Sequence, residues 1–315
     1  MSATSTRSLD LRGVPDGAQL ATAAVAMLEL RPGELLEVLA DDPHATRDFA
    51  VWCRAGGHRL VEHDQRDGVH HLIIQRQRLE PSAVFTEAEL DGLPGPVRRY
   101  LRAAIAPGTP LATAARLRMR GHIKVGRWLP FRAEQTLSPH RGFQWTARAA
   151  GVIAGFDRYA GGQGQMRWKL LGLLPLMQAD GPDVSRSAAG RAAAEAIWVP
   201  TALLPRFGVD WSAADDRHIT ARCRIDTVEV QTHYELDADG RVRSVVFDRW
   251  GDPDGTGTWG LHPFGGKVTA YATFDGLSVP SAGRFGWFFG TDRWSQGEFF
   301  RYRITELQLI GQHDS

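Results

Sequence analysis

The sequence predicts an α+β protein: an N-terminal two-layer βαβαββ sandwich, followed by a large curved antiparallel β-sheet, a half-barrel, with an inserted apolar helix. Three observations predict this. The chain has 315 residues, whereas one hydrophobic core rarely grows past about 250. Two helical patterns and a strand hairpin precede residue 78. Beyond residue 93, alternating strand patterns lie on both sides of one alanine-rich stretch. We place the domains at 7–78 and 93–312, with a linker at 79–92.

The first domain alternates strands and helices and ends in a hairpin. In chain order we expect a strand at 8–11, a helix at 19–30, a strand at 34–39, a helix ending at Cys53, and strands at 58–63 and 69–75. Breaks that contain Gly or Pro separate these elements. Asp67-Gly68 is a strong hairpin turn signal. Two helices on one face of a small sheet make a two-layer sandwich.

Three blocks of this domain, LDLRG, PGELLEVLADDP and RDFAVWCRAGGHRLVE, stand in the order and spacing of a known family. On these blocks, residues 8–76 resemble the small sulfur-carrier domain of the TusA/SirA type. In that family a Cys-Pro-x-Pro motif lies at the start of the first helix, where the helix dipole favours a thiolate that carries persulfide sulfur. In this chain Asp16 occupies the cysteine position, and both motif prolines are absent.

An aspartate at position 16 is compatible with the fold of this domain but not with sulfur transfer. An aspartate cannot carry sulfane sulfur, but it is a good N-cap for the same helix. Cys53, in the second helix, is interpreted as a small packed residue rather than as a replacement. We therefore expect the domain to persist as a docking module for a protein partner, without sulfur-carrier activity.

The composition sets limits on partners and location. A net charge of +1 gives no support for nucleic-acid binding, which usually shows as a concentrated basic surplus. The two cysteines, Cys53 and Cys223, lie far apart, so a CxxC metal site is impossible and no structural disulfide is expected. The N-terminus lacks the apolar core of a signal peptide, and no window is apolar enough to span a bilayer. We expect a soluble, cytoplasmic protein without a cofactor or a metal.

Strand patterns dominate the second domain after a helical segment at 97–105. In 116–125, apolar residues alternate strictly with basic ones, which predicts a half-buried antiparallel strand. Further strands are expected at 131–137, 143–149, 156–161, 165–171, 218–226, 228–236, 241–250, 267–274 and 298–310. About ten strands joined mostly by short turns describe a highly curved sheet, because a flat sheet of that width would be unusual.

An apolar stretch from Met166 to Pro205 interrupts these strands. Its first run, Leu170 to Met177, leads through a polar turn into an alanine-rich helix that ends at Ile197-Trp198-Val199-Pro200. Such a helix most simply covers the open face of a curved sheet. Nine of the ten tryptophans also lie in this domain, which fits either an aromatic core or the wall of an apolar cavity.

Four blocks of the second domain are similar to a widespread bacterial domain family of uncharacterised function. They are GHIKVGRWLPFRAEQ, GGQGQMRWKLLG, EAIWVPTALLP and VPSAGRFGWFFGTDRWSQGEFFRYRI. The resemblance covers most of residues 93–310 and implies no activity. The layout is also similar to that of lipoprotein-carrier folds, which bind acyl chains inside a half-open barrel.

These patterns favour a non-enzymatic protein that binds a hydrophobic or amphipathic, lipid-like small molecule in the second domain. The expected lining residues are Trp168, Leu171, Leu174, Ile197, Trp198, Leu203, Trp287 and Phe289, and the expected head-group readers are Arg127, Glu134 and Arg249. Glu134 could instead pair across strands with the basic face of 116–124. Glu195 is a further candidate ligand-binding residue, which would need a partner or a raised pKa if it faced inward. We take a position in solvent as the simpler one.

Two other functions stay open. An enzyme would use acids and arginines at the barrel mouth, such as Glu134, Asp248 and Asp252, and one of them would show a strongly shifted pKa within a pocket. A pure interaction protein in a sulfur-relay or regulatory complex would bind its partner around Asp16 and have a filled core. The sequence contains no G-x-S-x-G or H-E-x-x-H motif and no phosphate-binding loop.

Overall fold

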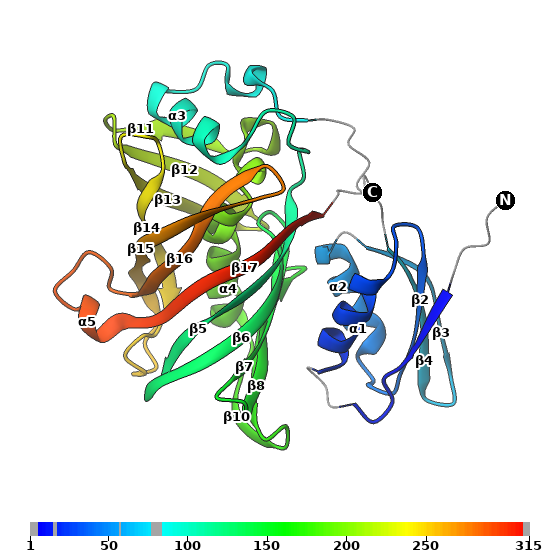
Figure 1. Ribbon diagram of the computed structural model, residues 1–315. Helices are drawn as coiled ribbons and strands as arrows, with labels where there is room; N and C mark the ends of the chain where they lie inside the picture. The colour runs from blue at the N-terminus through cyan, green and yellow to red at the C-terminus, as the bar shows by residue number, and fades with distance from the viewer. Residues whose placement is uncertain (1–5, 15–17, 57, 77–83, 311–315) are drawn as a thin grey trace.

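The computed structural model describes residues 6–14, 18–56, 58–76 and 84–310, which form two units with separate hydrophobic cores (Figure 1). The smaller unit contains β1 (Thr6–Asp10), α1 (Ala18–Glu29), β2 (Leu35–Ala40), α2 (Ala45–Gly56), β3 (Arg59–Arg66) and β4 (Val69–Gln75). Its strand order is β1-β2-β4-β3, with β1 parallel to β2 and the other pairs antiparallel. The expected βαβαββ order is therefore confirmed.

The core of the smaller unit lies between its sheet and its two helices. Every second residue of β2 is buried, from Leu36 through Val38 to Ala40, because the side-chain period of a strand is two. The helices supply Met27 and Phe49, both almost inaccessible to solvent. The two helices lie on the side of the small sheet that faces the larger unit (Figure 1).

The larger unit is one antiparallel sheet. Its strands are β5 (Ala114–Val125), β6 (Arg127–Ser138), β7 (Gly142–Ala149), β8 (Ile153–Ala160), β9 (Gln163–Leu170), β10 (Leu174–Ala179), β11 (Asp210–Ala213), β12 (His218–Ile225), β13 (Val228–Leu236), β14 (Val242–Gly251), β15 (Gly260–Phe274), β16 (Leu277–Trp287) and β17 (Glu298–Ile310). The 13 strands run in the order β10-β9-β8-β7-β6-β5-β17-β16-β15-β14-β13-β12-β11. The chain enters at β5, proceeds outward to the β10 edge, and returns from the β11 edge to β17 beside β5.

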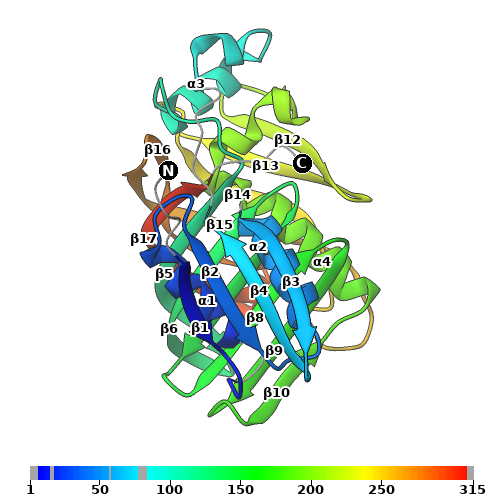
Figure 2. The same cartoon turned by 90° about the vertical axis from the view of Figure 1, so that its right-hand side faces the viewer.

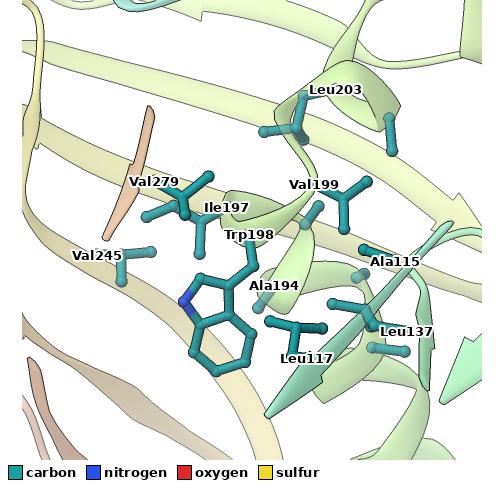
Figure 3. Packing of buried hydrophobic residues seen from close by; sticks show 14 of the residues in the cluster. Ala115, Leu117, Leu137, Ala194, Ile197, Trp198, Val199, Leu203, Val245 and Val279 are labelled. Carbon is teal, nitrogen blue, oxygen red and sulfur yellow. The ribbon is translucent and has the colours of Figure 1, made fainter. Parts of the chain in front are cut away.

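One segment crosses the sheet from edge to edge. It comprises α4 (Pro182–Ala194) and the short 3-10 helices η2 (Glu195–Trp198), η3 (Pro200–Leu203) and η4 (Pro205–Phe207), and it joins β10 to β11. Helix α4 packs against strands of both halves of the sheet, from β7–β9 to β12–β14. Trp198 and Ile197 enter the buried cluster that also holds Leu117 and Val245 (Figure 3). The alanine-rich helix thus covers the concave face, as the sequence predicts.

The remaining helices are short and peripheral to this crossing. They are η1 (Glu87–Leu90), α3 (Gly95–Ala104) and α5 (Trp294–Gly297). Within the described ranges, no helix is long and apolar enough to cross a bilayer.

Three strands were not expected from the sequence: β10, β11 and β16. In β16 the turn-forming residues Pro280 and Gly286 hide the strand pattern. Gly286 is required because a β-carbon there would lie 2.1 Å from the carbonyl oxygen of Gly297. Strand β10 carries Pro175, which an edge strand tolerates because its N–H need not join a ladder. The expected apolar run at Leu170 to Met177 is thus a hairpin turn and an edge strand.

The smaller unit packs on the outer face of the large sheet through α2, which contacts β5, β6 and β7 (Figure 2). Arg158 of β8 forms an ion pair with Asp48 at 2.9 Å, and Arg116 of β5 lies 3.1 Å from the Nε2 atom of His58. Both arginines are largely buried, so these contacts join the two units through desolvated charges rather than through loose surface pairs.

Candidate ligand-binding site

A cavity of about 220 Å³ lies on the concave side of the large sheet, beneath the crossing segment. Its wall is dominated by nine aromatic side chains: Trp145, Trp198, Phe247, Phe264, Phe285, Trp287, Phe299, Phe300 and Tyr302. Ile123, Met166, Ala194, Ile197, Val245 and Gly265 complete the apolar part. Alternation along β16 and β17 places Phe285 with Trp287, and Phe300 with Tyr302, on one face. Gly251 makes room for Trp287, since a β-carbon there would lie 2.3 Å from its ring.

Four charged residues line the same cavity: Asp157, Arg191, Glu195 and Arg249. Arg191 of α4 holds both carboxylates, donating from Nη1 to Asp157 at 3.0 Å and from Nε to Glu195 at 2.7 Å. The second oxygen of Asp157 accepts from the Trp168 indole at 3.0 Å, and that of Glu195 accepts from the Gln135 amide at 2.5 Å. The two acids are therefore fully engaged by the protein.

Arg249 differs from Arg191 because it has no carboxylate partner in the part of the chain that the structure describes. Among the described residues its one hydrogen bond runs from Nε to the Ser187 hydroxyl at 3.2 Å, and no carboxylate lies within 4.0 Å. Its guanidinium carbon lies 4.7 Å from the ring centre of Phe264 and 5.1 Å from that of Trp287. Cation–π contacts of this kind hold the guanidinium against aromatic rings, and no described residue accepts a hydrogen bond from its terminal nitrogens.

Burial sets the electrostatics of the cluster. It lowers the pKa of Arg249 to about 10, with a further lowering by Arg191 that Glu195 and Asp157 partly offset. Burial also raises the pKa of Asp157, against the opposing charge of Arg191. For Arg191 burial acts against the charge, but Glu195 and Asp157 outweigh it and the pKa is raised. Arg249 is thus the cation that gains most from an added anion, because water solvates it poorly.

Five of the residues proposed from sequence meet at this cavity: Glu195, Ile197, Trp198, Trp287 and Arg249. Trp168 stands directly behind the wall, with its ring centre 5.6 Å from that of Trp145. The expectation that Glu195 faces solvent is wrong. It turns inward, and Arg191 supplies the partner that an inward position requires.

The other proposed residues lie elsewhere. Leu203 is buried in the core away from the cavity, whereas Leu171 and Leu174 are exposed at the sheet edge. Phe289 packs on Trp294 of α5 with ring centres 5.0 Å apart. The remaining two are Arg127, exposed at the start of β6, and Glu134, which forms the cross-strand ion pair with Arg118 at 2.9 Å.

The sequence reading missed Asp157 and Arg191, although signals for both exist. Asp157 shares a strand face with the buried Tyr159, so the period of two places a carboxylate inside. Arg191 precedes Glu195 by four residues, the spacing of a helical ion pair. The sequence does not indicate that Asp157 and Arg191 lie together, because β8 and α4 are distant in sequence and meet only through the sheet topology.

The sulfur-carrier position of the smaller unit is not part of this cavity. Asp16 lies outside the described residues. Cys53 is buried in the core of the smaller unit, where burial raises the pKa of its thiol. Burial likewise raises the pKa of Cys223 to about 11. Neither thiol has the exposed, cationic surroundings that activate a cysteine.

The fold and the site define a two-domain protein, in which a sulfur-carrier-type domain precedes a half-barrel with an aromatic cavity. The model of the "Family of unknown function (DUF6544)" matches residues 83–299, and that of "Sulfurtransferase TusA" matches residues 7–76. The first match spans more than half of the chain. The chain therefore belongs to the DUF6544 family, with a TusA-type domain in front, and both resemblances found in the sequence are confirmed.

Relatives of known classification match the smaller domain. A putative sulfur carrier protein of Neisseria meningitidis is 34% identical over 70 residues, which are 22% of this chain and 95% of the relative. The putative sulfur carrier protein YrkI of Bacillus subtilis is 33% identical over 72 residues, 23% of this chain and 96% of the relative. These similarities concern the first domain and leave the larger domain undescribed.

Two solved structures resemble the chain at 10% identity. One is a putative outer membrane lipoprotein-sorting protein domain from Vibrio parahaemolyticus, with a TM-score of 0.34 over 64% of this chain and 87% of that one. The other is a LolA superfamily protein from Nitrosomonas europaea, with a TM-score of 0.37 over 74% and 96%. Neither is close enough to define the ligand or the action of this chain.

Proposed function

We propose that the larger domain binds a small amphipathic molecule, with its apolar body in the aromatic cavity and an anionic head group, most simply a carboxylate, at Arg249. The observation that carries this proposal is Arg249 itself. A buried guanidinium without a carboxylate partner is costly, and a planar carboxylate matches its paired donors. Because Asp157 and Glu195 both pair with Arg191, Arg249 remains available to bind the ligand.

The cavity size supports a restricted ligand class. At about 220 Å³ the cavity exceeds the roughly 150 Å³ apolar cavity that accommodates benzene. It falls below the roughly 300 Å³ at which small-molecule sites usually begin. A ligand with one ring system or one short acyl chain fits these limits, whereas a diacyl lipid does not. We therefore narrow the lipid-like ligand to a single-chain or single-ring carboxylate.

The smaller domain would then act as a docking module for a protein partner in the cytoplasm. Its match to the sulfur-carrier family supports a role beside sulfur-relay proteins, while the replacement of the motif cysteine by Asp16 argues against sulfur transfer at that position. A pure interaction protein has no use for an aromatic cavity with a buried cation. An enzyme built on Glu134, Asp248 and Asp252 is also disfavoured, because none of the three lines the cavity.

Native mass spectrometry of the freshly purified protein, followed by organic extraction, tests the proposal directly. We expect a co-purifying apolar molecule that is lost in Trp198→Asp. For the head group, titrations with octanoate and with octanol, followed by tryptophan fluorescence, should show at least tenfold tighter binding of the acid. Arg249→Gln should remove that preference, whereas Arg243→Gln, the same change at an exposed position of β14, should keep it.

Two outcomes would contradict the proposal. One is a protein that carries no apolar molecule and shows no fluorescence response to octanoate, decanoate or an aromatic carboxylate. The other is an equal preference for octanoate in the wild type and in Arg249→Gln, which would place the head group away from the buried arginine.

A further inference from the structure

The exposed apolar side chains of this protein are gathered at one place. Among the described residues, eleven large apolar side chains are exposed, and six of them lie on two neighbouring turns and the edge strand that follows. They are Val152, Leu171, Leu173, Leu174, Leu176 and Met177, with Leu173 80% exposed. The two turns touch, since the backbone N–H of Leu171 donates to the carbonyl of Val152 at 2.7 Å. A cluster of this kind marks an interaction site rather than scattered surface residues.

A row of cations leads away from this apolar cluster across the outer face of the sheet. The basic row consists of Arg303, Arg120, Arg132, Arg148 and Lys169, which follow one another in register on β17, β5, β6, β7 and β9, with Ala154 of β8 between the last two. At about 4.8 Å per strand the row spans roughly 24 Å. Lys169 is the penultimate residue of β9, and Leu171 directly follows the strand, so the row ends at the leucines.

The basic row is unusual because its charges are not balanced. No member has a carboxylate within 4.0 Å in the part of the chain that the structure describes, and like charges opposite each other destabilise a sheet. Some other exposed arginines of the larger unit do have carboxylate partners, such as Arg284 with Glu298 and Arg217 with Glu235. Over residues 120–133 and 142–178 the sequence has eight Lys or Arg and one acid, Asp157, and Asp157 faces the inner cavity.

A partner of this surface must provide anionic groups for the cations and an apolar environment for the exposed leucines. A nucleic acid or a free polyphosphate would use the basic row and leave the leucines in water. An anionic bilayer offers both components, phosphate head groups for the cations and an acyl boundary for the leucines. Four of these cations, Arg120, Arg132, Arg148 and Lys169, line a recess of about 940 Å³ that also reaches Leu171, Glu134 and Ala18 of the smaller unit, so head groups have space beside the apolar turn.

We propose that the β9–β10 hairpin and the basic row form a docking surface for an anionic lipid bilayer. The hairpin leucines enter the head-group boundary, and the row holds the charged head groups. The inner cavity adjoins this end of the sheet: Ile123, which lines the cavity, and the exposed Val125 are alternate residues on β5. The docking surface does not depend on whether the cavity takes a ligand.

Vesicle flotation tests the surface. The wild type should bind phosphatidylcholine vesicles that contain phosphatidylglycerol at least tenfold more tightly than vesicles of phosphatidylcholine alone, and high salt should reduce that binding. Leu173→Gln/Leu174→Gln should lose at least tenfold. Each of Arg132→Gln and Lys169→Gln should lose about fivefold, the effect of one surface cation near an anionic membrane. Leu261→Gln, at a leucine exposed elsewhere, and Arg243→Gln should bind as the wild type does.

Four results would overturn the proposal. The first is equal binding to both kinds of vesicle. The second is undiminished binding by the leucine double variant with an unchanged unfolding temperature. The third is that the wild type is a dimer by light scattering, the leucine double variant is a monomer, and neither protein binds vesicles. That result would assign the apolar edge to a second copy of the chain. Tighter binding of a single-stranded oligonucleotide than of anionic vesicles would also reject the bilayer.

Discussion

Two apolar runs of this chain lie within 35 residues of each other and end in opposite surroundings. In the run from Leu170 to Met177, Leu173 and Leu174 are 80% and 60% exposed, whereas Leu203 and Leu204 of the later run are almost completely buried. Both runs are rich in leucine and contain proline. The first forms a turn and the edge strand of a 13-stranded sheet, and the second crosses the concave face. Position in the topology, rather than composition, decides which run is buried.

The largest expected effect compares one leucine from each run. Leu203→Ala should lower the free energy of unfolding by about 2–5 kcal/mol, because it removes a fully buried side chain and leaves a cavity. Leu173→Ala should change it by less than about 0.5 kcal/mol, because that side chain is exposed. Urea denaturation of both variants measures the difference. Similar losses at both positions would mean that the edge hairpin is covered in solution.

A smaller effect compares the charged residues that accompany the two runs. Glu195→Ala should cost about 1–3 kcal/mol, since it deprives the buried Arg191 of one carboxylate and leaves the Gln135 amide without its acceptor. Lys169→Ala, beside the exposed run, should stay within about 0.5 kcal/mol. Chemical denaturation again measures both. Glu195→Gln keeps the size of the side chain and removes its charge. If this variant loses as little stability as Lys169→Ala, the ion pair with Asp157 alone is enough for Arg191.

The sequence predicts those features of this protein that follow from local periodicity. The alternation of 116–125 assigns the two faces of β5 correctly, because one buried face enforces a period of two. The family blocks of the smaller domain give its complete element order. The alanine-rich helix lies on the concave face as expected, where its small residues Ala189, Gly190 and Ala192 are buried. In each case the determining pattern lies within one element or between neighbours.

Features that depend on contacts between distant elements were not predicted. Glu195 faces inward because Arg191 and Gln135 meet it there, and Gln135 comes from β6, about 60 residues earlier. The cavity wall gains Phe264 and Phe300 from β15 and β17, which come late in the sequence. The exposure of Leu171 and Leu174 follows from the edge position of β10, and that position is fixed by the strand order rather than by any property of the run itself.

The smallest predicted effect concerns Leu171, whose backbone has a φ of 54°. A left-handed conformation disfavours side chains such as leucine by about 1 kcal/mol or more, whereas asparagine accepts it. Leu171→Asn should therefore raise the free energy of unfolding by about 1 kcal/mol while it weakens binding to anionic vesicles. Leu171→Ala removes the same side chain without relieving the backbone, so it should weaken vesicle binding equally but add little stability. If the two variants unfold alike, the turn does not disfavour leucine. If Leu171→Asn is more stable and binds vesicles less, the leucine is retained for the surface it forms rather than for the turn that it occupies.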